Sequence, residues 1–502
     1  MAAAMSADHP DLDPTRRPEP APVTTPNVLL LHCHDLGRYL GSYGIDTVQT
    51  PHLDALAADG IQLDQAFCTA PQCSPSRASL FTGKYPHAAG VNGLTHAQFA
   101  WDLNDDERHL ALELQEAGYA TSLLGVQHES RGNRSTEEMA ARLGFDRLLL
   151  DREIGHPCKA EDVATHARDE IARLAVGDRP FYLQVGFVEP HRLPGFSRSE
   201  PGYMGFISDY MEPDDERGVT VPPYIADEGE STRDELAELQ GAIRYLDAQV
   251  GRVLAALEET GQAENTLVIF TTDHGVALPR AKCALYDPGL EVAWVMRCPA
   301  LGWTGGMRVD EMVSNIDLFP TVLEAAGVRP RNEIHGRSLR PLLDRTDVAS
   351  GSDAPGPGGR GRPAAGRHPG RTHIFGEMTY HDYYDPRRCV RSRTYKLIAN
   401  FTAAPEFMDS SQSWRPRTMP TTPVRAYHPP IELYDLRTDP HETQNVADEA
   451  GYADIRAQLL RELYTWMRET GDPLLGGAVT SPLHELSVSL LAAAGEPVAS
   501  SG

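Results

Sequence analysis

Short runs of apolar residues, each closed by polar residues or glycine, recur along the first two thirds of the chain. Such runs are too short for buried helices and are typical of strands covered on both faces, as in a parallel sheet. Between 236 and 257, by contrast, Leu, Ile and Val recur every three or four positions, which predicts an amphipathic helix packed on the core. Strands are predicted at 27–35, 119–125, 181–187, 266–272 and 292–298.

The pattern changes near residue 348. The stretch 348–371 is rich in Gly, Pro and Arg and has no hydrophobic period, which predicts a disordered insert. Strands predicted at 391–400 and 431–436 and a helix at 452–470 then indicate a small antiparallel sheet with a packed helix. The predicted organisation is a disordered leader at 1–26, an α/β catalytic domain at 27–347, the insert at 348–371, a C-terminal α+β domain at 372–475 and a mobile tail at 476–502.

A cysteine lies at the start of a predicted helix. Pro75 suits the first turn of a helix, where its missing N–H has no consequence, and Gly83 is placed to end the helix. Cys73 therefore falls at a helix N-terminus, where free N–H groups and the helix dipole favour an oxyanion. Arg77, one turn later, adds a fixed positive charge.

Acidic residues follow two of the predicted strands where each strand ends. Asp35 closes the first strand, and Asp273 closes the strand at 266–272. Because a parallel sheet brings the carboxyl ends of its strands to one edge, residues far apart in the sequence meet there. We predict a metal site at this edge, close to Cys73.

The stretch 73–83 resembles the signature of the sulfatase family, C-x-P-S-R followed by a small residue, a hydrophobic pair and T-G. The resemblance runs from about 27 to 473 and is greatest to the heparan N-sulfatase branch, at 92–94 and 432–445. In this family the cysteine is converted to formylglycine, whose hydrated aldehyde is the nucleophile. The resemblance implies an alkaline phosphatase-like fold, with a large mixed, mostly parallel sheet sandwiched by helices, and hydrolysis of a sulfate ester or N-sulfate, with a sugar as a candidate substrate.

The resemblance also implies roles for single residues. Asp35, Asp273, His274 and residue 73 would hold the metal ion. His191 would protonate the leaving group, and His128 would take a proton from the remaining hydroxyl. The positive charges that face the sulfuryl oxygens would come from Arg77, Lys282 and His191.

Two further residues are predicted from their place in the chain alone. His87 and Asn92 lie on a glycine-rich loop shortly after the nucleophile. They are either solvated loop residues or candidates for contact with the substrate.

Two positions depart from the family pattern. Where the family has two adjacent aspartates, this chain has His34 and Asp35, so imidazole replaces a carboxylate. The family implies Ca²⁺, but imidazole is a poorer ligand for Ca²⁺ and a better one for Mn²⁺ or Zn²⁺, so the identity of the metal stays open. His34 either binds the metal or lines the site. Val126 stands where the family has a lysine, so that positive charge is missing.

These departures leave two alternatives to a sulfatase. The same site can serve a phosphonate or phosphate ester hydrolase, and a sulfatase fold can also serve as a non-catalytic binding protein. Retention of Cys73, Arg77, His128 and His191 together argues against the binding protein.

The net charge and the cysteine content limit the kinds of binding partner and the cellular compartment that are expected. The net charge of −25 argues against non-specific binding to nucleic acid or anionic membranes, although a local cationic cluster can still bind an anionic substrate. The seven cysteines are scattered, without a C-x-x-C pair, which indicates a reducing compartment. The sequence shows no signal peptide and no apolar span. We expect a cytoplasmic protein matured by a formylglycine-generating enzyme; its oligomeric state stays open.

Overall fold

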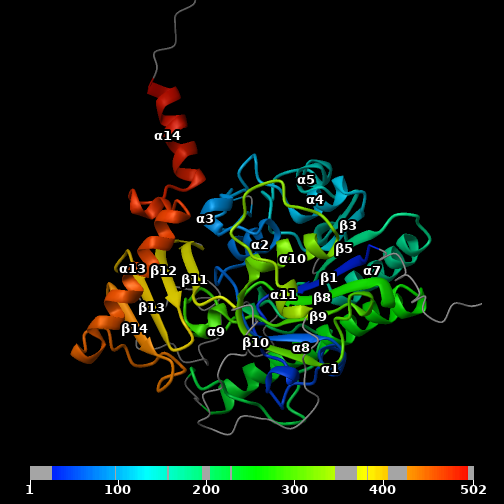
Figure 1. Cartoon of the computed structure of the whole chain (residues 1–502), viewed down its shortest axis with the longest axis horizontal. Coiled ribbons are helices and arrows are strands. Elements are labelled where there is room, and N and C mark those ends of the chain that lie inside the picture. The colour runs from blue at the N-terminus through cyan, green and yellow to red at the C-terminus, as the bar shows by residue number, and fades with distance from the viewer. Residues whose placement is uncertain are drawn as a thin grey trace, which may run out of the picture.

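The computed structural model describes residues 25–96, 98–154, 158–194, 204–225, 229–344, 370–381, 383–404 and 427–495. The predicted leader and insert therefore lie almost wholly outside the described residues. Within these ranges the chain forms a large sheet with helices on both faces and a smaller sheet beside it (Figure 1). None of the described helices combines the length and the apolar composition needed to cross a membrane.

The large sheet is mixed and mostly parallel, as predicted. Its eight strands lie in the order β10-β2-β9-β8-β1-β5-β3-β4, and only the two pairings made by β9 are antiparallel. The five predicted strands are present as β1, β3, β5, β8 and β9. The strands run over Asn27–Cys33 (β1), Ile61–Phe67 (β2), Ala120–Gly125 (β3), Arg147–Leu150 (β4), Phe181–Gly186 (β5), Thr266–Thr272 (β8), Trp294–Arg297 (β9) and Met307–Ser314 (β10).

The apolar pattern missed the strands at the two ends of this sheet. β4 and β10 are only partly buried, so their residues mix exposed and buried positions and form no continuous apolar run. β2 was also not predicted, because Gln62, Asp64 and Gln65 interrupt its apolar residues. Their place in the sheet depends on pairing with neighbours that are distant in the sequence.

Two hydrophobic cores cover the two faces of the sheet. Along β1, Val28 and Leu30 enter one core and Leu29 and Leu31 the other, because successive side chains of a strand point to opposite faces. The first core is closed by α2, α4 and α10, and the second by α1, α7 and α8 (Figure 1). These helices run over Pro51–Asp59 (α1), Cys73–Thr82 (α2), Leu110–Glu116 (α4), Ala160–Ala175 (α7), Glu230–Glu259 (α8) and Leu318–Ala325 (α10).

Shorter helices join these elements. They run over Pro86–Ala89 (α3), Thr136–Leu143 (α5), Asp151–Ile154 (α6), Asp287–Leu290 (α9) and Arg340–Leu343 (α11).

The C-terminal part is the expected antiparallel sheet with one packed helix. Four strands pair in chain order, and α13 covers one face through Leu459, Leu463 and Trp466. The first two strands were not predicted. The elements run over Ile374–Tyr380 (β11), Tyr384–Arg391 (β12), Tyr395–Asn400 (β13), Ile431–Asp435 (β14) and Ala453–Glu469 (α13).

The segment predicted as a mobile tail has regular structure over part of its length. Val479 packs beside the smaller sheet and accepts a hydrogen bond from Tyr380 at its carbonyl. The helix α14 (Pro482–Gly495) follows and projects away from the rest of the molecule (Figure 1). Its large apolar side chains, among them Leu486 and Leu490, are exposed.

Buried charges join the smaller sheet to the domain of the large sheet. Asp287 of α9 accepts from Arg391 of β12 (2.9 Å) and from Lys396 of β13 (2.8 Å). The Lys396 ammonium also lies 2.8 Å from Glu442, and both side chains are inaccessible to solvent. Burial raises the pKa of Glu442 to about 7, whereas Lys396 and Arg391 hold the pKa of Asp287 below its usual range against the effect of burial.

We expect Lys396→Met to lower the free energy of unfolding by about 3–5 kcal/mol, because removal of one partner leaves buried carboxylates without compensation. Urea unfolding checks this. The matched control is Arg308→Met, which removes an exposed partner of Asp64 and should cost no more than about 1 kcal/mol. A Lys396→Met cost as small as that of the control would contradict the account.

Candidate active site

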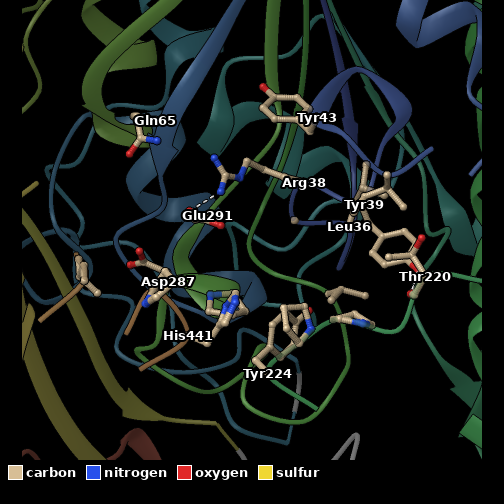
Figure 2. A pocket seen from close by; sticks show the side chains of 18 of the residues that line it. Leu36, Arg38, Tyr39, Tyr43, Gln65, Thr220, Tyr224, Asp287, Glu291 and His441 are labelled. Carbon is tan, nitrogen blue, oxygen red and sulfur yellow. Dashed lines mark hydrogen bonds and ion pairs between the residues drawn. The ribbon is translucent and has the colours of Figure 1, made fainter. Parts of the chain in front are cut away.

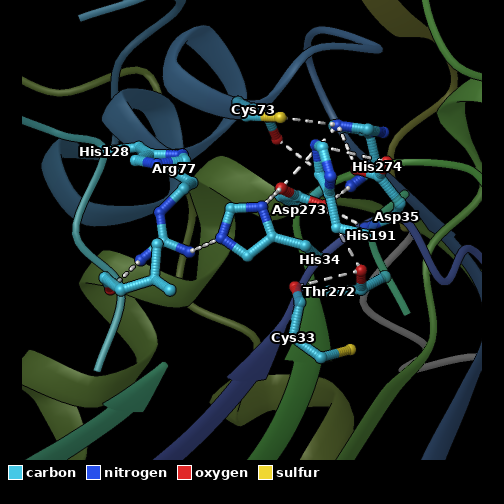
Figure 3. A network of polar contacts seen from close by, with 12 residues as sticks. Cys33, His34, Asp35, Cys73, Arg77, His128, His191, Thr272, Asp273 and His274 are labelled. Atoms are coloured by element: carbon cyan, nitrogen blue, oxygen red, sulfur yellow. Dashed lines mark hydrogen bonds and ion pairs between the residues drawn. The ribbon is translucent and has the colours of Figure 1, made fainter. Parts of the chain in front are cut away.

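Four parallel strands end at one edge of the large sheet, and each is followed by a residue predicted for the site. β1 leads into Asp35 and β8 into Asp273. β3 and β5 lead into His128 and His191. Figure 3 shows these side chains in one group with Cys73, because the carboxyl ends of parallel strands lie at the same edge of a sheet.

The helix α2 brings Cys73 to this edge. It begins at Cys73, has Pro75 in its first turn and ends at Gly83, whose φ of 70° lies in the left-handed region. The Cys73 Sγ lies 3.4 Å from Nε2 of His274. Burial raises the pKa of the Cys73 thiol well above its usual range, so the thiol itself is not an activated nucleophile.

In each of the two carboxylates, of Asp35 and Asp273, one oxygen accepts hydrogen bonds from the protein and the other accepts none. Asp273 Oδ1 accepts from the backbone N–H of Asp35 (3.0 Å) and of His274 (2.8 Å). Asp35 Oδ2 accepts from Lys282 Nζ at 2.7 Å. The remaining oxygens, Asp35 Oδ1 and Asp273 Oδ2, are buried and accept no hydrogen bond, although His34 Nδ1 lies 3.0 Å from Asp273 Oδ2. Such oxygens are costly unless a cation compensates them.

Nε2 of His274 lies close to these two oxygens and offers a third electron pair to a metal ion. Its Nδ1 lies 2.9 Å from the carbonyl oxygen of Gly275, which can only accept, so Nδ1 carries the proton and Nε2 is free of it. Nε2 lies 3.3 Å from Asp35 Oδ1 and 3.7 Å from Asp273 Oδ2. Burial lowers the pKa of His274, although both aspartates oppose the effect. The donor set fits a divalent metal ion beside residue 73.

Lys282 joins the metal site to His191. Its Nζ donates to Asp35 Oδ2 and, at 3.0 Å, to His191 Nε2. Nδ1 of His191 donates to the carbonyl of Arg192 at 2.5 Å. Burial lowers the pKa of His191 to about 3, with Lys282 adding to the effect and Asp35 opposing it. His191 is therefore neutral near neutral pH, and the proton that faces it belongs to Lys282.

Cys73, His191 and Lys282 face a cavity of 450 Å³. His34, Cys73, His128, His191 and Lys282 line its polar side. Burial holds the pKa of His128 well below its usual range, with His96 adding to the effect, so His128 is neutral and able to accept a proton. The apolar side is formed by Leu94, Phe99, Val126, Val188, Leu193 and Met204.

Arg77 does not take the position expected for it. Its guanidinium is buried and donates through Nε to Glu129 (2.7 Å), through NH1 to His32 and His34, and through NH2 to the carbonyl of Val126. It is not among the residues that line the cavity. Its charge is balanced by Glu129, and it contacts the cavity lining through His34 and the backbone of Val126.

His87 and Asn92 also lie away from the cavity. His87 Nδ1 contacts Glu377 of the smaller sheet at 2.5 Å, and its Nε2 lies 3.2 Å from the carbonyl of Thr470. The backbone carbonyl of Asn92 accepts from Tyr380. In the sequence both residues are near Cys73, but the chain turns them toward the C-terminal domain.

The sequence analysis missed Glu129 and His32. Glu129 follows His128 directly, and its Oε2 accepts from the backbone N–H of His128 at 3.0 Å. A buried glutamate that neutralises the charge of Arg77 cannot be recognised from a sequence motif. His32 precedes His34 by two positions on the same face of β1, a spacing that offered a signal.

A second cavity, of 510 Å³, lies between the catalytic domain and the C-terminal sheet (Figure 2). Its lining includes Arg38, Tyr39, Tyr224, Glu291 and His441. Arg38 and Glu291 form an ion pair across it. None of the residues predicted for the site lines it.

The fold and the donor set beside Cys73 define an alkaline phosphatase-like hydrolase. The Sulfatase family model matches residues 26–328, and the chain belongs to the sulfatase family. Its members hydrolyse sulfuric ester or sulfamate bonds.

The curated relatives cover nearly the whole chain. Human N-sulphoglucosamine sulphohydrolase is 29% identical over 495 residues, covering 89% of this chain and 91% of its own. Human arylsulfatase A is 29% identical over 467 residues, covering 87% of this chain and 86% of its own. These relatives favour a sulfatase over the two alternatives considered from the sequence.

Solved structures confirm the fold. The phosphonate monoester hydrolase of Agrobacterium radiobacter superposes with a TM-score of 0.64 at 22% identity, over 89% of this chain and 96% of its own. The protein BT4656, solved with D-glucosamine-2-N,6-O-disulfate, superposes with a TM-score of 0.60 at 20% identity, over 89% of this chain and 99% of its own. The predicted α/β architecture is therefore confirmed.

Glu189, two positions before His191, makes stability depend on pH. Burial raises its pKa to about 7; its Oε1 accepts from Ala160 and its Oε2 is buried without a partner. The folded state therefore keeps a proton that the unfolded chain loses near its ordinary pKa of 4.5. Stability from this group is present below pH 4.5 and is lost as pH rises to about 7.

We expect Glu189→Gln to remove this loss. The wild type loses free energy of unfolding between pH 5 and pH 8. In the variant this loss should be smaller by up to roughly 3 kcal/mol, because each pKa unit corresponds to 1.36 kcal/mol. Urea unfolding at the two pH values measures it. Glu258→Gln, at an exposed position of α8, is the control and should follow the wild type. Parallel pH profiles of Glu189→Gln and wild type would refute the account.

Proposed function

We propose that this sulfatase hydrolyses its substrate with residue 73 in the formylglycine form as the nucleophile. One observation carries the proposal: Cys73 lies at the N-terminus of α2, in contact with His274 and next to the unpartnered oxygens of Asp35 and Asp273. A buried thiol with a raised pKa is a poor nucleophile, which supports a modified residue at this position.

A divalent metal would be held by Asp35, Asp273, His274 and residue 73. Bound there, it lowers the pKa of the attacking hydroxyl and polarises the sulfuryl group. The protein itself contributes the fixed geometry, because the backbone N–H groups of Asp35 and His274 hold Asp273 Oδ1 in place.

Lys282 and His191 serve the leaving group as a pair. The Lys282 ammonium faces the cavity beside Asp35 and donates to His191 Nε2, so it supplies both a positive charge and a proton. The sequence analysis gave the role of general acid to His191 alone. In this arrangement Lys282 and His191 share that role. Arg77 has no part in charge compensation at the sulfuryl oxygens, since its donors are directed to Glu129, His32, His34 and Val126.

His128 is the base for the second half of the reaction. It lines the cavity, and because burial lowers its pKa it is neutral and has an electron pair that can accept the proton of the second hydroxyl of the hydrated residue 73. Its Nδ1 is buried and has no hydrogen-bond partner. Loss of that proton releases sulfate and restores the aldehyde.

A sulfated sugar is the substrate class that the relatives favour. The human relative is named for N-sulphoglucosamine, and BT4656 was solved with a glucosamine disulfate as its substrate. We propose an N- or O-sulfated sugar here. Maturation by a formylglycine-generating enzyme follows from the proposal, and the seven cysteines, all buried and unpaired, support a reducing, cytoplasmic setting.

Peptide mass spectrometry across residue 73, combined with hydrolysis of an aryl sulfate and of glucosamine N-sulfate, tests the function. Protein made with the converting enzyme should carry the formylglycine mass and release sulfate. Cys73→Ala should release none. Formylglycine at residue 73 without hydrolysis of either substrate would overturn the proposed activity, whereas unmodified cysteine would overturn the proposed nucleophile.

We expect Lys282→Met to lower kcat on the order of 10²-fold or more, because it removes a charge and a proton donor that act in the transition state. Steady-state kinetics with the aryl sulfate measure the effect. Lys84→Met removes a lysine that pairs with Glu107 outside the cavity and should leave kcat unchanged. Equal kcat values in both variants would exclude the role given to Lys282.

A further inference from the structure

His34 occupies the position of a family carboxylate, and its two ring nitrogens face different partners. Nε2 lies 3.1 Å from NH1 of Arg77, and Nδ1 lies 3.0 Å from Oδ2 of Asp273 (Figure 3). The ring is buried, with 2% of its surface exposed.

Arg77 determines which nitrogen of His34 carries the proton. A guanidinium has only donors, so Nε2 has to be the acceptor and the proton of the neutral ring lies on Nδ1. Glu129 and His32 hold the guanidinium in this orientation. Nδ1 of His34 therefore carries the hydrogen, lies 3.0 Å from Asp273 Oδ2 and has no electron pair for a metal ion.

Without His34, four ligands remain for the metal ion, and one of them is an imidazole nitrogen. They are Asp35 Oδ1, Asp273 Oδ2, His274 Nε2 and residue 73. A carboxylate oxygen has two electron pairs, so Asp273 Oδ2 can face both His34 and a cation. Among the described residues, the group of possible ligand atoms around Cys73 holds the carboxylates of Asp35 and Asp273 and also His34, which its tautomer excludes as a ligand.

Ca²⁺ takes six to eight oxygen ligands, whereas Mn²⁺ and Zn²⁺ accept imidazole and fewer ligands. Building on the proposed function, we propose that this site selects a transition-metal dication, Mn²⁺ or Zn²⁺, over Ca²⁺. His34 acts as a positioning residue: it orients Asp273 and removes one negative charge from the site without binding the metal.

Competition for metal tests the selectivity without any activity measurement. Metal-free protein is equilibrated with equal free concentrations of Ca²⁺, Mn²⁺ and Zn²⁺, and the bound metal is counted by mass spectrometry. The wild type should retain about one Mn²⁺ or Zn²⁺ per chain, and Asp273→Asn should lose it. A wild type that retains mainly Ca²⁺ would overturn the proposal.

His34→Asp restores the family carboxylate and should shift the ratio of bound Ca²⁺ to transition metal upward by about tenfold or more. His34→Gln keeps the site without that carboxylate and should retain the preference of the wild type. Thermal melting shows that each variant is folded. An unchanged ratio in a folded His34→Asp variant would overturn the role of His34.

Pulsed EPR of the Mn²⁺-loaded wild type separates positioning from ligation. One directly bound nitrogen, from His274, is expected, and it should persist in His34→Gln. Two bound nitrogens in the wild type would show that His34 binds the metal. These readouts are independent of sulfate release, so a protein that selects Mn²⁺ or Zn²⁺ but hydrolyses no sulfate would refute the proposed function alone.

Discussion

Asp35 and Asp273 carry negative charge in a place that water does not reach, and the rest of the site is built around that charge. An ionised carboxylate in the interior needs donors or a cation. Burial raises the pKa of Asp35, but His191 and Lys282 outweigh the effect and bring the pKa to about 2. Two backbone N–H groups and Lys282 satisfy one oxygen of each aspartate. The two remaining oxygens point to one position beside Cys73.

A second buried charge, that of Arg77, stabilises the surroundings of this position rather than the substrate. Glu129 neutralises it, and its NH1 group connects His32 and His34. The backbone between Val126 and Glu129 is tied to the same pair, which sets the position of His128. One arginine thereby connects the helix that carries residue 73 with the ends of β1 and β3.

The sequence analysis was most successful where chemistry and strand ends coincide. Asp35, Asp273, His128 and His191 each follow an apolar strand, and the structure brings all four together because parallel strands end at one edge. The structure places His87, which is close to Cys73 in the sequence, against Glu377, 290 positions away. Proximity along a loop says little about the direction of a side chain, because that direction depends on which distant element packs against the loop.

The sequence by itself determined the family and the architecture, and it placed Asp35, Asp273 and Cys73 at one edge of the sheet, because short motifs and apolar periodicity depend on neighbouring residues. Tertiary structure decided what each cationic or titratable group does. Arg77 is paired with Glu129, Lys282 holds the proton opposite His191, and His34 is oriented by Arg77. Charge, protonation and tautomer depend on burial and on partners that are far away in the chain, and a local pattern carries no record of them.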